Sequence, residues 1–148
     1  MSIQMKVVKL NPKAVLPVKP YAGNAGWDLT YIGEDVFINP GENKLLNTGL
    51  GFYFDKGWGM LIRNRGGMAG KKCLVVGAEL VDSNYSGEVF VDLHNISQSV
   101  KEVKHGDRVA QFVLIKVPQV EFEEVNSVEF EELHNNTERG AKALGSSG

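Results

Sequence analysis

The sequence predicts an all-β protein: a sandwich, jelly roll or barrel of about ten short strands. Short runs rich in valine, isoleucine, phenylalanine and leucine recur between clusters of glycine, proline, asparagine and aspartate. Many runs alternate in side-chain character, as in Val89–Leu93, and this period of two is typical of a half-buried strand. Turn sequences such as Asn39–Glu42 and His105–Asp107 separate the runs, and no long stretch has the 3.6-residue period of a helix.

Each apolar run defines one expected strand, and the length of 148 residues suits a single domain with its own core. We expect strands at Gln4–Leu10, Asp28–Tyr31, Asp35–Ile38, Asn43–Phe54, Gly59–Asn64, Leu74–Val76, Glu79–Val81, Gly87–Asn95, Val100–Val103 and Arg108–Pro118.

The composition excludes several classes of function. The chain has 16 basic and 18 acidic residues and a net charge of −2, so we expect no broad surface for nucleic acid or membrane. A polyphosphate ligand would have to be met by a few local cations. The single cysteine, Cys73, allows no intrachain disulfide, which fits a reducing compartment. We interpret Cys73 as a small core residue and not as a nucleophile.

The two ends of the chain carry different expectations. The start, MSIQMKVVKL, lacks the apolar region of a signal peptide, and no apolar run reaches the roughly 18 residues of a membrane span. We therefore expect a cytoplasmic protein, or one of the host cytoplasm or nucleus if the source is viral. Val120–Leu133 reads as two similar acidic-apolar halves. It could be a solvated edge segment, but we favour a strand that packs on a neighbouring subunit.

From His134 onward the sequence is polar and rich in glycine, so it cannot bury enough apolar area to order itself. The sequence thus predicts a β domain at residues 1–133 and a flexible arm at residues 134–148. The arm is either a disordered tail or a segment that closes over a ligand.

Three segments have compositions that suggest chemistry. Ile62–Lys72 places four cations and three glycines in eleven residues, which suits a phosphate cradle as well as a plain basic loop. Val81–Gly87 is a tight turn in which Asp82 could be a base or only a turn aspartate, and Tyr85 only a hairpin aromatic. Arg139–Gly148 combines glycines, serines and two cations, a composition suited to wrapping a polyphosphate.

The order of these segments resembles the five motifs of the trimeric dUTP diphosphatases (dUTPases). All five lie in order between residue 25 and the end of the chain. The matching segments are Ala25–Leu29, Arg65–Lys71, Leu80–Gly87, Gly106–Gln111, and Arg139–Gly140 with Gly145–Gly148.

The resemblance implies a jelly-roll fold, a homotrimer with three sites that are each built from several subunits, and hydrolysis of dUTP to dUMP and pyrophosphate with Mg²⁺. It implies that Asp82 is the general base that activates water, and that Tyr85 stacks under the deoxyribose and rejects a 2′-hydroxyl. Asp28 would support the Mg²⁺ region or the loop that carries Arg65. The phosphates would be contacted by Arg65, Gly66, Gly67 and Gln111, and the arm would close over the substrate through Arg139, Leu144, Gly145, Ser146 and Ser147.

The chain departs from the family pattern mainly where the base would bind. Gly66 replaces the serine of the second motif, so a phosphate-binding hydroxyl is lost. Leu144 replaces the aromatic that would cover uracil, and Ala143 stands where the family has glycine. Val76 and Gly77 stand where an asparagine is usual, and Glu79 replaces a glycine. These changes bear more on recognition of the base than on phosphate hydrolysis, so another or a modified deoxynucleotide is an alternative substrate.

Two other functions fit parts of the sequence. In dCTP deaminase, a relative that shares the fold, the catalytic glutamate precedes an asparagine by three residues, and Asp92 has that relation to Asn95. However, the serine and second arginine of its phosphate motif fall on Gly66 and Gly70. A catalytically weak trimer with a binding or regulatory role is the other alternative.

Overall fold

The computed structural model describes residues 2–135 and 137–145. The described residues form eleven strands in four small antiparallel sheets. The strands are β1 (Lys6–Lys9), β2 (Trp27–Thr30), β3 (Val36–Ile38), β4 (Asn43–Asn47), β5 (Leu50–Tyr53), β6 (Trp58–Arg63), β7 (Leu74–Val76), β8 (Leu80–Val81), β9 (Phe90–Asn95), β10 (Lys101–Val103) and β11 (Arg108–Lys116). A π-helical turn, η1 (Gly67–Lys71), and a helix, α1 (Ser127–Leu133), complete the elements.

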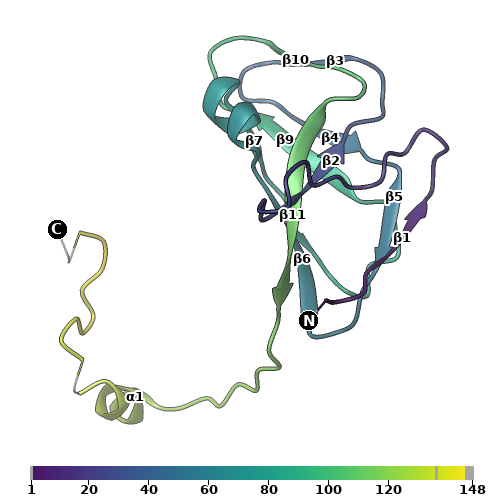
Figure 1. Ribbon diagram of the computed structural model, residues 1–148. Coiled ribbons are helices and arrows are strands. Elements are labelled where there is room, and N and C mark those ends of the chain that lie inside the picture. Colours follow the sequence, from purple (N-terminus) through teal and green to yellow (C-terminus); the bar gives the residue numbers. More distant parts are fainter. Residues whose placement is uncertain (1, 136, 146–148) are drawn as a thin grey trace. The chain divides into compact units, whose positions relative to one another are not determined.

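Two of the sheets carry the residues of interest. The four-stranded sheet has the order β2-β11-β6-β8, so the long strand β11 lies between β2 and β6 (Figure 1). The three-stranded sheet has the order β4-β9-β7. The remaining pairs are β1 with β5 and β10 with β3. This architecture confirms the predicted all-β, jelly-roll-like fold.

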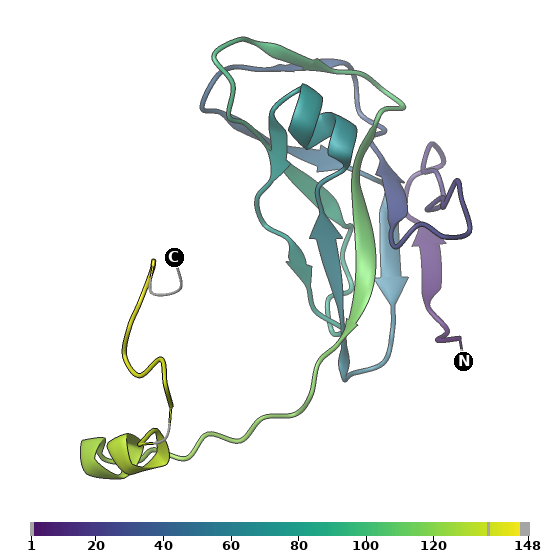
Figure 2. The same cartoon turned by 60° about the vertical axis from the view of Figure 1, so that its left-hand side comes forward.

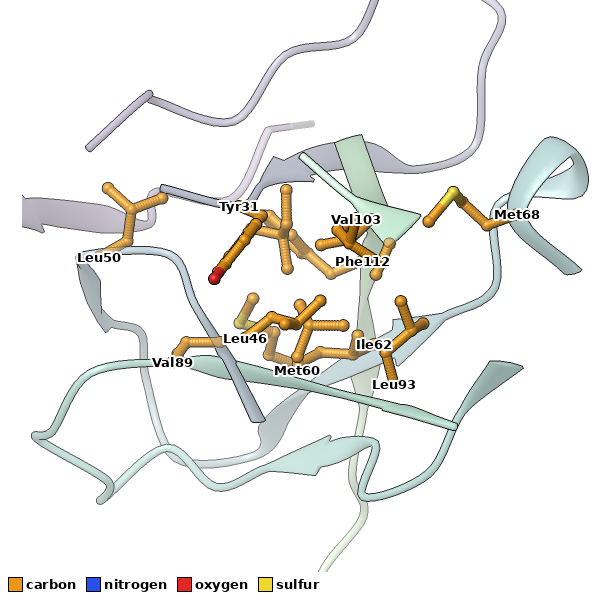
Figure 3. Packing of buried hydrophobic residues seen from close by; sticks show 14 of the residues in the cluster. Tyr31, Leu46, Leu50, Met60, Ile62, Met68, Val89, Leu93, Val103 and Phe112 are labelled. Carbon is orange, nitrogen blue, oxygen red and sulfur yellow. The ribbon is translucent and has the colours of Figure 1, made fainter. Parts of the chain in front are cut away.

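The core is a single cluster to which nearly every strand contributes. In Figure 3 the labelled side chains of Leu46, Met60 and Leu93 face those of Tyr31 and Phe112 across a shared interior. Leu46, Leu93 and Met60 are almost fully buried. Burial of a large aliphatic side chain stabilises a fold by roughly 1.5–3 kcal/mol. This packing therefore holds the two main sheets, and the loops that connect their strands, in fixed positions.

The expected strand Asn43–Phe54 is divided at Gly49. Gly49 has a φ of +67°, and an added Cβ there would lie 2.7 Å from Ile32 Cδ1. Only glycine adopts this conformation in so small a space without strain. The break lets β4 pair with β9 while β5 pairs with β1.

The strand expected within Val120–Leu133 is wrong. Residues 119–126 carry no strand, and Ser127–Leu133 is helical. Asn126 caps the helix because its side-chain oxygen accepts a hydrogen bond from Glu129 N at 2.9 Å. This Asn-x-x-Glu spacing is a helix-start signal that the acidic-apolar repeat obscured.

The chain divides into two compact units, Met1–Pro118 and Gln119–Gly148. The first contains all the strands. In the second, the described residues beyond α1 form turns without a further helix or strand. No described helix has both the length and the apolar character to span a membrane.

Candidate active site

Strand pairing brings a row of polar residues together on the four-stranded sheet. Gln111 of β11 lies opposite Asp28 of β2 on one side and opposite Arg63 of β6 on the other. Opposite residues of antiparallel strands point to the same face of a sheet. Segments that are far apart in the sequence therefore meet at one place.

Asp28, at the β2 end of this row, contacts two arginines. Its side chain is 8% exposed, and its Oδ1 accepts a hydrogen bond from Arg65 Nε at 3.1 Å. Arg108 Nη1 lies 3.5 Å from Asp28 Oδ2, and Arg65 Nη1 donates to the Arg108 carbonyl at 3.0 Å. Since a buried carboxylate costs free energy unless it is paired, Asp28 holds both arginines in place. We call Asp28, Arg65, Arg108 and Gln111 the charged cluster.

The charged cluster keeps donors free for a ligand. A guanidinium has five N–H donors, and the contacts of Arg65 use two of them. Gln111 Nε2 donates one hydrogen to the Asn64 carbonyl at 2.8 Å. Gly26 makes room for this side chain, because a Cβ there would lie 2.6 Å from Gln111 Oε1. Arg65 and Gln111 are thus positioned by other protein groups while part of each remains able to bind an anion.

The glycines that follow Arg65 border open space. An added Cβ at Gly66, Gly67 or Gly70 would meet nothing within 4 Å, and none of the three has a positive φ. The fold itself therefore does not require glycine at these positions. The turn η1 is anchored by the buried side chain of Met68 and lies at the same end of the domain as the start of β11 (Figures 1 and 2). Bare backbone beside a cation is suited to close approach by a phosphate.

Cys73 follows η1 in a strained conformation. Its φ is +56°, the one positive φ among the described non-glycine residues. The residue is only partly buried. The prediction that Cys73 is a core residue is therefore wrong, because the turn after η1 places it at the edge of the core.

Asp82 and Tyr85 lie at a second place, the hairpin between β7 and β9. The two arms separate beyond β7, because β7 pairs with β9 whereas β8 pairs with β6. A pocket of about 240 Å³ opens between them, and its lining includes Asp82, Tyr85, Val89 and Phe90. We call this the hairpin pocket. Tyr85 OH donates to the Glu88 carbonyl at 2.7 Å, which fixes the ring over the turn.

Asp92 is a second carboxylate in the hairpin pocket. Its Oδ2 accepts from Ala78 N at 3.0 Å and contacts His94 Nε2 at 3.0 Å, and its Oδ1 accepts from Asn43 Nδ2 at 2.8 Å. Burial acts to raise the pKa of Asp92. The hydrogen bonds from Ala78, Asn43 and His94 outweigh burial and hold the pKa below its ordinary value. Asp92 is therefore ionised at neutral pH.

The predicted site residues thus fall into separate groups. Asp28, Arg65 and Gln111 gather in the charged cluster beside Gly66 and Gly67, whereas Asp82 and Tyr85 line the hairpin pocket. No hydrogen bond or ion pair of residues 2–135 joins Asp82 or Tyr85 to the charged cluster.

The arm residues belong to the second compact unit. Arg139 Nε donates to the Lys142 carbonyl at 3.0 Å, Leu144 is fully exposed, and Gly145 has a φ of +79°. Ser146 and Ser147 lie outside the described residues, so their predicted roles stay predictions.

The sequence did not reveal two supporting residues. Arg108 shares Asp28 with Arg65. Asn64 accepts from Gln111 through its backbone carbonyl and from Val76 N through its side chain at 2.7 Å, so it joins the charged cluster to the base of the hairpin. The position of Asn64 between Arg63 and Arg65 was the only signal, and it says nothing of these partners.

The fold and the charged cluster define a jelly-roll protein whose Arg65 and Gln111 keep N–H donors free for an anion. The sequence profile of the dUTPase family matches residues 12–148. The chain belongs to the dUTPase family, whose members are nucleoside triphosphate pyrophosphatases. The family predicted from the motifs is thereby confirmed.

Individual relatives cover almost the whole chain. A deoxyuridine 5′-triphosphate nucleotidohydrolase of Nautilia profundicola is 42% identical over 148 residues, which are 99% of each chain. Its counterpart in Pseudomonas fluorescens is 38% identical over 99% of this chain and 97% of that protein.

Solved structures show the same fold at lower identity. A mutant dUTPase of Staphylococcus bacteriophage 80alpha with dUpNHpp has a TM-score of 0.85 and 23% identity over 98% of both chains. A mutant dUTPase of Staphylococcus aureus phage phi11, described for its coordination of a structural Mg(II) ion, has a TM-score of 0.77 and 20% identity over 84% of this chain and 97% of that chain.

Proposed function

We propose that this protein hydrolyses dUTP to dUMP and pyrophosphate, with Asp82 as the general base. The observation that carries the proposal is that the Asp82 carboxylate is exposed and has no partner among the described residues. Asp82 lines the hairpin pocket, and no hydrogen bond of the described residues uses its carboxylate. A carboxylate free of partners can accept a proton from water. Relatives that are 38–42% identical carry the name of this activity, which supports the choice of dUTP.

In the proposed reaction Asp82 takes one proton from a water molecule while the water oxygen attacks the α-phosphorus. The bond between the α-phosphorus and the oxygen that bridges to the β-phosphorus breaks, and pyrophosphate leaves. One water is consumed for each dUMP and pyrophosphate formed. A positioned base typically contributes 10²–10⁴-fold to such a step.

The charged cluster would stabilise the negative charge of the triphosphate. Arg65 retains free N–H donors, Gln111 retains one, and the backbone at Gly66 and Gly67 is open to approach. Donors that are fixed before the substrate arrives need no reorganisation during the reaction, which is why they favour the transition state.

Mg²⁺ enters this proposal as part of the substrate. Among the described residues, no three His, Cys, Asp or Glu side chains gather closely enough to hold a metal ion. Both oxygens of Asp28 already face arginines. The chain thus offers no dedicated cage, whereas Mg²⁺ is usually bound through substrate phosphates, waters and one or two carboxylates. Asp28 would act on the metal only indirectly, through the arginines beside the phosphates.

Tyr85 would select deoxyribose. Tyr85 is 45% exposed and lines the hairpin pocket, and its hydroxyl is held by the Glu88 carbonyl. An added Cβ at Gly87 would lie 2.6 Å from the Tyr85 hydroxyl, so the ring sits close against the turn. A sugar packed flat on this ring leaves no room for a 2′-hydroxyl. The arm would then close over the bound nucleotide through Arg139, Leu144, Gly145, Ser146 and Ser147.

The separation of the two groups supports a site shared between subunits. The hairpin pocket holds the proposed base, while the charged cluster holds the phosphate donors, and within residues 2–135 they have no direct bond. We infer a homotrimer in which the charged cluster of one subunit meets the hairpin pocket of another. Closed cyclic symmetry gives three equivalent sites of this kind.

A pyrophosphate-release assay tests the proposed function. The purified protein is incubated with Mg²⁺ and dUTP, dCTP, dTTP, dATP, dGTP or UTP, and the products are separated by chromatography. We expect dUMP and pyrophosphate from dUTP, with little turnover of UTP. Formation of dUTP from dCTP would indicate a deaminase, and no turnover of any nucleotide would indicate a binding protein.

A further inference from the structure

The closed end of the hairpin pocket is built around one carboxylate. The arms of the hairpin are paired as far as Val76 and Leu93, and Gly77 N still donates to the Asp92 carbonyl at 2.8 Å. At the next residue the ladder stops, because Ala78 N donates to the Asp92 side chain. Asp92 therefore occupies the point at which the arms part.

Gly77 is what allows this arrangement. A Cβ at Gly77 would lie 2.4 Å from Asp92 Oδ2 and 2.3 Å from His94 Nε2. Any side chain at Gly77 would displace the Asp92 carboxylate and the His94 ring. The absence of a Cβ thus places the Asp92 carboxylate over the backbone at the closed end of the hairpin pocket.

Asp92 has capacity for one more hydrogen bond. A carboxylate has about four lone-pair sites. Ala78, His94 and Asn43 occupy three of them, with a single contact on Oδ1. The Asp92 side chain is 13% exposed, and its residue belongs to the pocket lining. The remaining site is an acceptor that a ligand in the pocket can use.

The other polar side chains of the hairpin pocket are Tyr85, Glu88 and Asp82, and the first two are already bonded to the protein. The Tyr85 hydroxyl is bonded to the Glu88 carbonyl, and Glu88 Oε1 accepts from Gly49 N at 2.7 Å. Asp82 is the proposed base. The rest of the lining is mostly apolar and includes Leu45, Leu80 and Phe90, each more than a third exposed. An apolar slot with one free acceptor at its closed end suits a flat heterocycle with one N–H at its edge.

We propose that Asp92 is a specificity-determining residue that accepts a hydrogen bond from an N–H donor of the pyrimidine base. This proposal rests on the proposed function in one respect, namely that the nucleoside lies in the hairpin pocket. Val76 and Gly77 stand where an asparagine is usual near the base, and neither has a side chain that can donate or accept a hydrogen bond. The donor on the base is either the ring N3–H of uracil or the 4-amino group of cytosine.

The variant Asp92→Asn tests this role with little change of shape. The amide oxygen is needed where Ala78 N and His94 donate, so the NH₂ group replaces Oδ1, and the Asn43 amide turns so that its oxygen accepts from this group. In the variant an NH₂ donor would then face the base, at the position where the wild-type protein has the acceptor Oδ1. Asp35→Asn is the matched control, because Asp35 also accepts from a backbone amide, that of His105, but lies outside the hairpin pocket.

Binding is measured by calorimetry with the non-hydrolysable α,β-imido analogues of dUTP, N3-methyl-dUTP and dCTP. If N3–H is the donor, Asp92→Asn weakens the dUTP analogue roughly 10- to 100-fold, the range for a hydrogen bond to a charged group, and leaves the N3-methyl analogue within about threefold. If the 4-amino group is the donor, the dCTP analogue is the one that loses affinity. Asp35→Asn changes none of the three.

Equal weakening of all three analogues, or no change in any, would overturn the proposal. Gly77→Ala is a second variant that displaces the carboxylate without altering it, and it should produce the same selective loss. Because binding is measured without turnover, the role of Asp92 can be judged even if the pyrophosphate assay fails. Conversely, dUTP hydrolysis with unchanged base selectivity in Asp92→Asn would leave the proposed function intact and remove this inference.

Discussion

The charged cluster and the hairpin pocket are built in different ways. In the charged cluster a buried carboxylate, Asp28, and a backbone carbonyl, that of Asn64, fix the arginine and glutamine side chains. In the hairpin pocket the arms part, apolar side chains are exposed, and Asp82 has no partner among the described residues. The first is prearranged within one chain, whereas the second is open.

This difference matches the pattern of the sequence. The segments that form the charged cluster follow the family motifs closely, apart from Gly66, and the segments around the hairpin pocket contain Val76, Gly77 and Glu79 as departures. Glu79 forms an exposed ion pair with Arg63 at 2.9 Å, a contact that a glycine could not make. We infer that phosphate handling in this chain follows the family, while recognition of the base has its own solution.

Removal of the base should have the largest effect. Asp82→Asn keeps the size of the side chain but cannot accept the proton, so kcat should fall at least ~10²-fold. Binding of dUpNHpp should persist, since the charged cluster is untouched. Steady-state pyrophosphate release and calorimetry measure the two quantities. Near-normal turnover would show that the hairpin pocket does not supply the base.

Truncation after Glu138 should reduce turnover by roughly tenfold or more, because the closing arm excludes water and adds donors. The thermal unfolding of the β domain should not change, since the arm belongs to the other compact unit. Unchanged kinetics in the truncated protein would assign the arm no role.

Within the arm, Leu144→Phe should improve dUTP affinity by roughly two- to tenfold through stacking on the base.

Asp28→Asn should weaken the charged cluster without touching the hairpin pocket. A neutral amide holds Arg65 less firmly than a carboxylate, since charge-assisted hydrogen bonds are roughly twice as strong as neutral ones. We expect KM for dUTP to rise about tenfold, which corresponds to about 1.4 kcal/mol. Titration of the rate with dUTP measures the change. The same substitution at Asp35 serves as the control, and an equal rise in KM there would show that the effect is not specific.

Cys73→Gly should have the smallest effect, on stability alone. A non-glycine residue at positive φ destabilises the folded state by roughly 1–2 kcal/mol, and glycine removes this strain. Glycine also gives the unfolded chain more conformational freedom, which cancels part of the gain in stability. The free energy of unfolding should therefore rise by about 0.5–1 kcal/mol, measured by urea denaturation. A lower value for Cys73→Gly would mean that the contacts of the cysteine side chain outweigh its backbone strain.

The sequence predicted the fold and most strands because alternation and turn residues are local signals. It missed η1, since three glycines in one loop do not suggest a helical turn, and it missed α1, since the acidic-apolar repeat obscures the Asn126 cap. It also identified Asp28 and Arg65 as related, but not Arg108. That contact depends on the register of β2 against β11, with the irregularity between Arg108 and Ala110, and no local pattern encodes it.

Asp92 illustrates the same limit in the hairpin pocket. Its spacing to Asn95 resembles that of a catalytic pair in dCTP deaminase and does not indicate a place at the base of the hairpin. Its position over the hairpin depends on a missing Cβ at Gly77 and on a hydrogen bond to Ala78, fifteen and fourteen residues away in the chain. Such contacts are visible only once the two arms have been brought together.

The central claim is that one active site joins the charged cluster of one subunit to the hairpin pocket of another. The most direct test mixes two inactive proteins, Asp82→Asn and Arg65→Ala, by unfolding them together and refolding. In a cyclic trimer each mixed assembly contains one site with both groups intact, so random mixing should restore about a quarter of the wild-type rate of pyrophosphate release from dUTP. A mixture no more active than the two variants measured separately would contradict the shared site.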